Sequence, residues 1–126
     1  MISFDEMETL LYEITDTFPP ELFDGLNGGV ILLEDIKTHA ESVSRDPLYT
    51  LGEYHCDPMG LGRYVTVYYG SFTRVYPGLG IGKLKEKLTD VIKHELTHHW
   101  ESLAGEKDLE IKDMRELYEY RKRKEN

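Results

Sequence analysis

Residues 82–105, GKLKEKLTDVIKHELTHHWESLAG, form the longest regular pattern in the chain. Apolar residues recur in this stretch every three or four positions, with charged residues between them. The apolar positions are Leu84, Leu88, Val91, Ile92 and Leu96. This spacing predicts an amphipathic helix that begins near Gly82, packs one face against a core and ends near Gly105, a residue type that commonly terminates helices.

The chain before this helix predicts two shorter helical segments. Residues 3–17 carry apolar residues at helical spacing, and Ser3 is a suitable N-cap because Glu6 follows three positions later. Two prolines end this helix, and they can start a short helix over residues 21–26.

Three segments have the composition of β-strands. Residues 30–34 are short and mostly apolar, residues 49–55 are a second candidate, and residues 63–72 are the clearest because they are rich in β-branched and aromatic side chains. After the long helix, residues 107–124 again place apolar residues at helical spacing. The order predicts one α+β domain over residues 1–126, with an N-terminal helix, a small mixed sheet, the long helix and a C-terminal helix.

The composition limits the classes of function. The chain has 126 residues and a net charge of −9, and an acidic chain lacks the positive surface expected of a nucleic-acid-binding protein. The basic run 121–124 is expected to lie at a helix C-terminus, where the helix dipole favours cations. The single cysteine, Cys56, excludes an internal disulfide and fits a reducing compartment. The chain starts without a signal-peptide pattern, and no apolar run approaches the roughly 20 residues that span a bilayer, so we expect a cytoplasmic protein with no membrane partner.

The long helix contains the pattern H-E-x-x-H at His94, Glu95 and His98. Residues four apart lie on one face of a helix about one turn apart, so the two histidines can bind the same ion. Imidazole nitrogen suits zinc, and Glu95 is placed to take a proton from a metal-bound water and pass it to a leaving amine. His99 points off this face and is not expected to be a ligand. The pattern predicts a zinc site; the alternative is a polar helix face whose histidines contact only solvent.

A catalytic zinc ion usually has three protein ligands, so this pair needs a third. Glu101 is two helical turns from His94, which is too far to share an ion on a straight helix, although it can orient His98. Cys56 is another candidate, or it is an inert residue. Beyond Gly105 the chain can turn back towards the histidines. The carboxylates available there are Glu106, Asp108 and Glu110.

Three stretches of the sequence resemble the small bacterial zincin-like metallopeptidases known as minimal zincins. They are FPPELFDGLNGGVILLED (18–35), LGEYHCDPMGLGRYVTVYYGSF (51–72) and HELTHHWESLAGEKDLE (94–110), and the resemblance extends over about residues 18–120. The motif of that family is H-E-x-x-H-H-x-G-x-x-D, in which the aspartate is the third zinc ligand. The resemblance implies a compact zincin fold and one bound zinc ion.

The family motif maps onto this chain with one departure. Glu101 stands where the family has glycine, and the G-x-x-D pattern follows three residues later, from Gly105 to Asp108. An insertion of three residues adds nearly one helical turn, about 4.5 Å, before that glycine. The resemblance then implies that Asp108 is the third ligand, with Glu110 and Glu106 as the next candidates.

The resemblance also implies an activity, that of a zinc-dependent peptidase acting on a peptide or protein substrate with Glu95 as general base. In zincins a strand near the cleft pairs with the extended substrate; residues 64–70 are the corresponding segment, unless they form a core strand. A tyrosine sometimes stabilises the oxyanion in such sites. The available tyrosines are Tyr68, Tyr69, Tyr118 and Tyr120. Two other functions stay open: a zinc-binding interaction module without catalytic activity, and a metal-dependent amidase or deformylase that uses Cys56.

Overall fold

A computed structural model describes residues 1–40 and 47–106 of the chain. The predicted C-terminal helix over 107–124 lies outside these residues. The elements follow in the order α1 (Phe4–Asp16), the 3-10 helix η1 (Pro20–Phe23), β1 (Gly29–Leu33), β2 (Gly52–Asp57), β3 (Gly62–Tyr68), α2 (Tyr69–Val75) and α3 (Ile81–Glu106). The predicted α+β class is confirmed. None of the described helices is both long enough and apolar enough to cross a membrane.

Helix α1 begins after Ser3, which forms a capping box with Glu6. The Ser3 hydroxyl accepts a hydrogen bond from the backbone N–H of Glu6, and the Glu6 carboxylate accepts one from the backbone N–H of Ser3, each at 3.1 Å. This reciprocal pair satisfies two N–H groups that have no partner within the helix. The predicted helix over residues 3–17 is confirmed, and its apolar face is buried.

The sheet has the order β1-β3-β2, and it is mixed because β1 is parallel to β3 whereas β2 is antiparallel to it. The central strand is therefore β3, which hydrogen-bonds to a neighbour on each side. Residues 64–70 are predicted either as a substrate-binding edge or as a core strand, and for residues 64–68 the core strand is correct. Among the described residues, β2 is paired on one side only, and it lies beside α3.

The strand predicted over residues 63–72 is correct only as far as Tyr68. The chain then turns into α2, where Ser71 and Phe72 are buried. At Gly70 the backbone passes close to the segment that follows β1, because a Cβ atom there would lie 2.7 Å from the carbonyl oxygens of Glu34 and Asp35. Glycine at this position therefore allows α2 to pack closely against the segment after β1.

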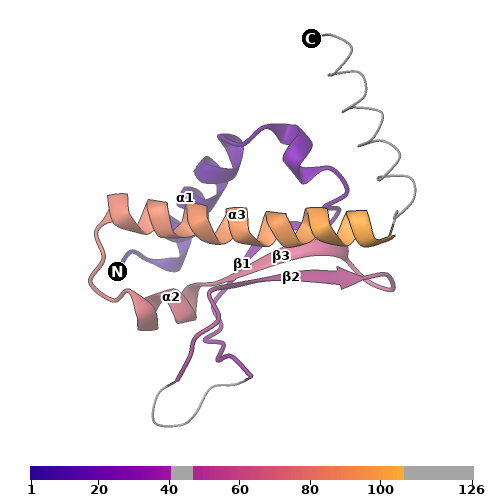
Figure 1. The fold of residues 1–126 in the computed structure, drawn as a ribbon. Helices are drawn as coiled ribbons and strands as arrows, with labels where there is room; N and C mark the ends of the chain where they lie inside the picture. Colours follow the sequence, from indigo (N-terminus) through magenta and orange to yellow (C-terminus); the bar gives the residue numbers. More distant parts are fainter. Residues whose placement is uncertain (41–46, 107–126) are drawn as a thin grey trace, which may run out of the picture.

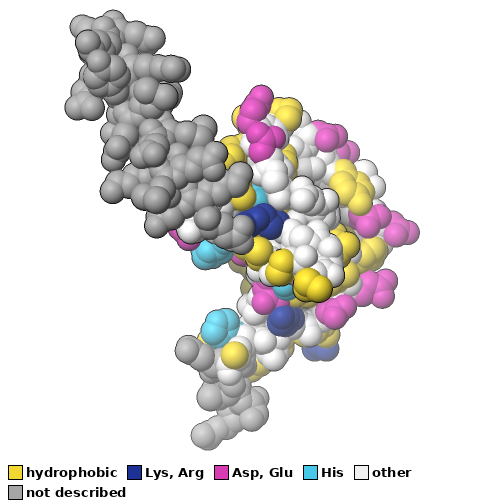
Figure 2. Space-filling view, turned by 90° about the vertical axis from the view of Figure 1, so that its right-hand side faces the viewer, with side chains coloured by type: hydrophobic (Ala, Val, Ile, Leu, Met, Phe, Trp, Pro, Cys, Tyr) yellow, Lys and Arg dark blue, Asp and Glu magenta, His cyan; other side chains and the backbone are white. Residues whose placement is uncertain are grey.

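The hydrophobic core lies between the sheet and the helices α1 and α3, with α3 running along the sheet (Figure 1). It takes in four of the five apolar positions predicted for α3, and Val91 packs against its edge. The residues buried to the greatest extent come from α1, β3, α2 and α3. They include Met7, Leu11, Ile14, Val65, Val67, Phe72, Leu84, Leu88 and Ile92. Acidic side chains are spread over the surface shown in Figure 2, in keeping with the negative net charge.

Candidate metal centre

His94 and His98 lie one turn apart on α3, and both side chains are exposed. Their Nε2 atoms are 3.1 Å apart, and their rings are nearly perpendicular, with centroids 4.7 Å apart. Two nitrogens bound to one tetrahedral zinc ion at about 2.0–2.1 Å would be separated by about 3.3 Å. The observed separation is close to that value, so the donor pair fits the ion inferred from the sequence.

Glu95 completes a compact group, because one ligand atom from each of His94, Glu95 and His98 lies within 4.8 Å of the others. Unlike the two histidines, Glu95 is buried, with 5% of its surface exposed. Burial raises the pKa of its carboxyl group above the ordinary glutamate value, and Glu53 acts in the same direction, whereas His94 and His98 act to lower it. A carboxylate with a raised pKa is better suited to accept a proton than an ordinary one.

Gly52, the first residue of β2, allows the strand to approach α3 at the position of Glu95. A Cβ atom on Gly52 would lie 2.6 Å from Cγ1 of Val91 and 3.6 Å from Cγ of Glu95. The first distance is shorter than a carbon–carbon contact allows, so a side chain at this position would push the helix away from the strand. Glycine at position 52 thus sets how close Glu95 lies to the edge of β2.

We expect Gly52→Ala to destabilise the protein by about 1–3 kcal/mol, because the added methyl group overpacks a filled contact. Denaturant unfolding monitored by circular dichroism measures this free energy. Gly78→Ala is the matched control, since a Cβ atom on Gly78 would have no atom within 4 Å. Equal stability of the Gly52 variant and the wild type would contradict the described contact.

The three grouped residues lie in a cleft between α3 and the edge of β2 that has no partner strand among the described residues, here called the free edge. Two adjoining hollows are bordered in common by His39, Thr50, Gly52, His94 and Glu95, so together they form one continuous cleft. One end is lined by aromatic residues that include Tyr49 and Tyr76, and the other end includes Glu53 and Glu101. No sequence pattern indicated His39 or Thr50, because the fold brings them to the cleft from a segment without a motif.

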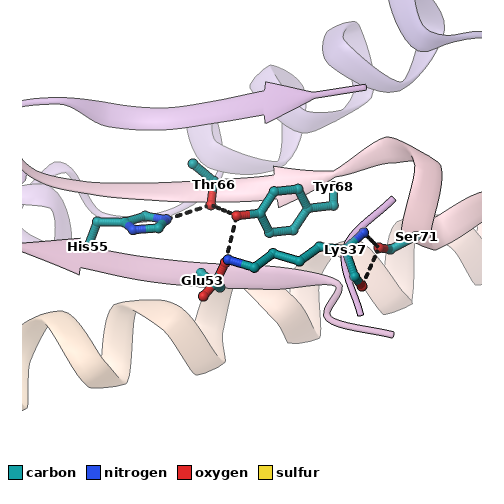
Figure 3. Close-up of polar contacts among 6 residues, drawn as sticks. All are labelled: Lys37, Glu53, His55, Thr66, Tyr68 and Ser71. Atoms are coloured by element: carbon teal, nitrogen blue, oxygen red, sulfur yellow. Dashed lines mark hydrogen bonds and ion pairs between the residues drawn. The ribbon is translucent and has the colours of Figure 1, made fainter. Parts of the chain in front are cut away.

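A chain of polar contacts connects the edge of this cleft to the sheet (Figure 3). The Tyr68 hydroxyl donates a hydrogen bond of 2.6 Å to Glu53, which also pairs with the ammonium group of Lys37. The Thr66 hydroxyl lies 3.1 Å from that of Tyr68 and 2.8 Å from Nε2 of His55. Burial opposes ionisation of Glu53, but the hydrogen bonds from Lys37 and Tyr68 outweigh it and lower its pKa. The hydrogen bond to Glu53 raises the pKa of Lys37.

We expect this ion pair to add a small, pH-dependent stability. Because the pKa of Glu53 is lowered, its contribution is complete above the ordinary glutamate pKa and is lost as pH falls through the lowered value. Because the pKa of Lys37 is raised, its contribution is lost only as pH rises through that raised value. Both side chains are partly exposed, so a double-mutant cycle with Lys37→Met and Glu53→Gln should give a coupling of about 0.5 kcal/mol near pH 7. Urea unfolding near pH 7 and near pH 2 measures it; a coupling of equal size at both pH values would contradict the assignment.

The structure describes some of the candidates for the third ligand but not others. Oε2 of Glu101 is 3.6 Å from Nδ1 of His98, the ring nitrogen that does not face His94, which suits an orienting role better than direct ligation. Cys56 borders the same cleft but is not one of the grouped ligand residues. Asp108 and Glu110 lie outside the described residues, as does the side chain of Glu106. The assignment of Asp108 therefore stays a prediction.

The tyrosines suggested for oxyanion stabilisation lie elsewhere or outside the described residues. Tyr68 is buried and donates to Glu53, and the Tyr69 hydroxyl donates to the backbone carbonyl of Ile2 at 2.6 Å. Tyr118 and Tyr120 are not among the described residues. Three tyrosines that no sequence pattern singled out border the cleft instead, namely Tyr49, Tyr54 and Tyr76.

Comparison with solved structures finds three matching chains. A conserved hypothetical protein from Thermus thermophilus superimposes with a TM-score of 0.68 at 28% sequence identity, over 82% of this chain and 99% of the other. No protein-family model and no curated protein sequence matches the chain. The comparison supports the α+β architecture over most of the chain.

Proposed function

We propose that this protein is a zinc-dependent peptidase of the zincin type, with His94 and His98 as metal ligands and Glu95 as general base. The observation that carries the proposal is the 3.1 Å separation of the two Nε2 atoms beside a buried carboxylate in an open cleft. Asp108 is proposed as the third ligand on the resemblance alone.

The free edge of β2 suits an extended peptide. The backbone N–H of Tyr68 bonds to the carbonyl oxygen of Leu51, so Leu51 and Tyr68 form a hydrogen-bonded antiparallel pair. Such pairs alternate along a strand, so Gly52 and Tyr54 direct their backbone N–H and C=O groups away from β3. A peptide that adds to this edge would pair with these groups and pass directly beside Glu95.

The chemistry divides between the ion and the protein. When bound, zinc supplies a water of lowered pKa and polarises the substrate carbonyl. Glu95 accepts a proton from the attacking water and donates it to the leaving amine. Glu95 is buried at the cleft. His94 and His98 are exposed, which leaves room for a third ligand and for substrate.

The test is metal analysis followed by cleavage of a peptide library. Purified protein prepared with zinc should contain about one equivalent of zinc, and mass spectrometry should detect peptide hydrolysis that ceases when the zinc is chelated. Protein that binds no metal after this preparation would contradict the proposal. Bound zinc without turnover of any peptide would instead indicate the interaction module.

A metal-dependent amidase or deformylase is the second candidate, and the position of Cys56 favours it. This residue lies in the same cleft as both histidines, on the edge strand β2. A thiolate would complete a three-ligand set of the kind found in deformylases. In that case Cys56→Ser would abolish zinc binding and Asp108→Ala would not, whereas the peptidase proposal expects the opposite pattern.

A further inference from the structure

His99 is the most deeply buried histidine among the described residues, although it adjoins the exposed His98. Its side chain is 0% exposed, and both of its ring nitrogens have partners. Five helical positions rotate it by about 140° from His94, so it faces the protein and not the cleft. The ring therefore points away from His94 and His98, as the spacing predicted. Its burial and its two hydrogen-bond partners indicate a role other than metal binding.

The hydrogen bonds of His99 define which nitrogen carries the proton. Nε2 lies 2.8 Å from the backbone carbonyl oxygen of Asp24, which can only accept, so Nε2 is the donor. Nδ1 lies 2.9 Å from the Tyr54 hydroxyl. In the neutral ring Nδ1 has to accept, so the Tyr54 hydroxyl donates to it. The ring is thus held in the Nε2–H tautomer by one partner on each side.

The same tyrosine extends the chain of hydrogen bonds to a buried arginine. Nη1 of Arg63 donates to the Tyr54 hydroxyl at 2.9 Å and to the Ser102 hydroxyl at 2.5 Å. Arg63 belongs to β3, Tyr54 to β2, and His99 and Ser102 to α3. The donors of this chain therefore point in one direction, from Arg63 through Tyr54 to His99 and on to Asp24.

The Asp24 carbonyl is presented by a turn that only glycine adopts readily. Gly25 has φ of +80°, and a Cβ atom on it would lie 3.7 Å from Cε1 of His99. The left-handed residue lets the chain after η1 pass beside α3 with its carbonyl aimed at the ring. Thus three segments widely separated in the sequence meet at one imidazole.

We propose that His99 is a positioning residue that fixes the rotation of α3 about its own axis, so that His94, Glu95 and His98 face the free edge of β2. The inference rests on the proposed metal site. Glu95 lies one turn before His99. Hydrogen bonds link His99 to β2 and to the turn after η1, and Tyr54 extends them to Arg63 of β3, so they hold this part of the helix in place. Misplacement of a catalytic group by about 1 Å can cost about 100-fold in rate, so an element carrying both ligands and base requires a fixed orientation.

The test compares zinc affinity among variants that retain or remove individual hydrogen bonds. Tyr54→Phe removes the donor to Nδ1, His99→Leu removes both ring contacts, and His99→Gln can keep a donor to Asp24. Tyr69→Phe is the matched control, because it also deletes a partly buried tyrosine hydrogen bond but at a site near the N-terminus. Competition titration should show that Tyr54→Phe and His99→Leu weaken zinc binding at least about tenfold, and that His99→Gln weakens it less.

The control separates positioning from general stability. Tyr69→Phe should lower the unfolding midpoint much as Tyr54→Phe does while leaving zinc affinity unchanged. If Tyr54→Phe binds zinc as tightly as the wild type does, the proposal is overturned. Should His99→Leu fail to fold, Tyr54→Phe and His99→Gln decide the outcome.

A measurement without metal keeps this inference distinct from the proposed function. Labelled wild-type protein should give the ¹⁵N shifts of an Nε2–H tautomer at His99, and a nuclear Overhauser contact between a methyl group of Val91 and the α-protons of Gly52, which joins α3 to β2. This contact should be weakened in Tyr54→Phe and kept in Tyr69→Phe. A His99 ring in the Nδ1–H form, or an unchanged contact between Val91 and Gly52 in Tyr54→Phe, would overturn the positioning role. If the wild type binds no zinc, the proposed function fails and these spectra still decide the orientation of α3.

Discussion

Replacing Glu95 with glutamine is expected to leave zinc bound and to reduce peptide hydrolysis by about 100- to 10,000-fold, the range for loss of a general base. Glutamine keeps the size of the side chain and its place in the cleft, but its amide oxygen cannot take up and release the proton. Initial rates on the best library peptide, together with the zinc content of the same sample, measure the two halves of this prediction.

Glu86→Gln is the matched control for this variant. Glu86 is on the same helix, but its exposed carboxylate pairs with Lys83 at 3.3 Å and is not among the grouped ligand residues. The control should retain most of the activity. Loss of zinc from the Glu95 variant would show that the carboxylate, which is close enough to both histidines to bind the ion, is a ligand and not a base.

Zinc is expected to raise the free energy of unfolding by about 4 kcal/mol when its free concentration is about 1,000 times Kd, because the folded protein binds the ion and the unfolded chain binds it poorly. His98→Ala should abolish this increase, since His94 and the proposed ligand Asp108 fall short of the three protein ligands that a catalytic zinc ion usually has. Urea unfolding in zinc buffers and with a chelator measures the difference.

His55→Ala is the control for His98→Ala, because it also removes a histidine side chain. His55 points to the side of the sheet that carries Thr66, and it is not among the grouped ligand residues (Figure 3). This variant should keep the full response to zinc. An equal response in His98→Ala and wild type would place the bound zinc at another site.

The parts of the structure that depend on neighbours in sequence could be predicted from the sequence. The capping box at Ser3, the buried stripe of α3 and the pairing of His94 with His98 are all set by spacings of three or four residues. A helix converts such spacings directly into contacts, without information about the rest of the fold. For this reason the candidate ligand pair and the candidate base can be predicted without knowledge of the tertiary structure.

The errors arise where distant segments meet. The composition of residues 63–72 is that of a strand throughout, but the strand ends at Tyr68, and in α2 Gly70 packs closely against the segment after β1, a contact that composition does not reveal. Nor does composition show which strand is central, because strand order depends on partners far away in the sequence. The cleft position of His39 and the contact between His99 and Asp24 were missed for the same reason.

The strand order also has a consequence for how the molecule assembles. β2 and β3 are consecutive and joined by a short turn, whereas the parallel pairing of β1 with β3 joins segments that have the whole of β2 between them. Closing the larger loop costs more chain entropy, so the hairpin can form early and β1 must be added later. The edge proposed to receive the peptide therefore belongs to the half of the sheet that needs the fewest long-range contacts to form.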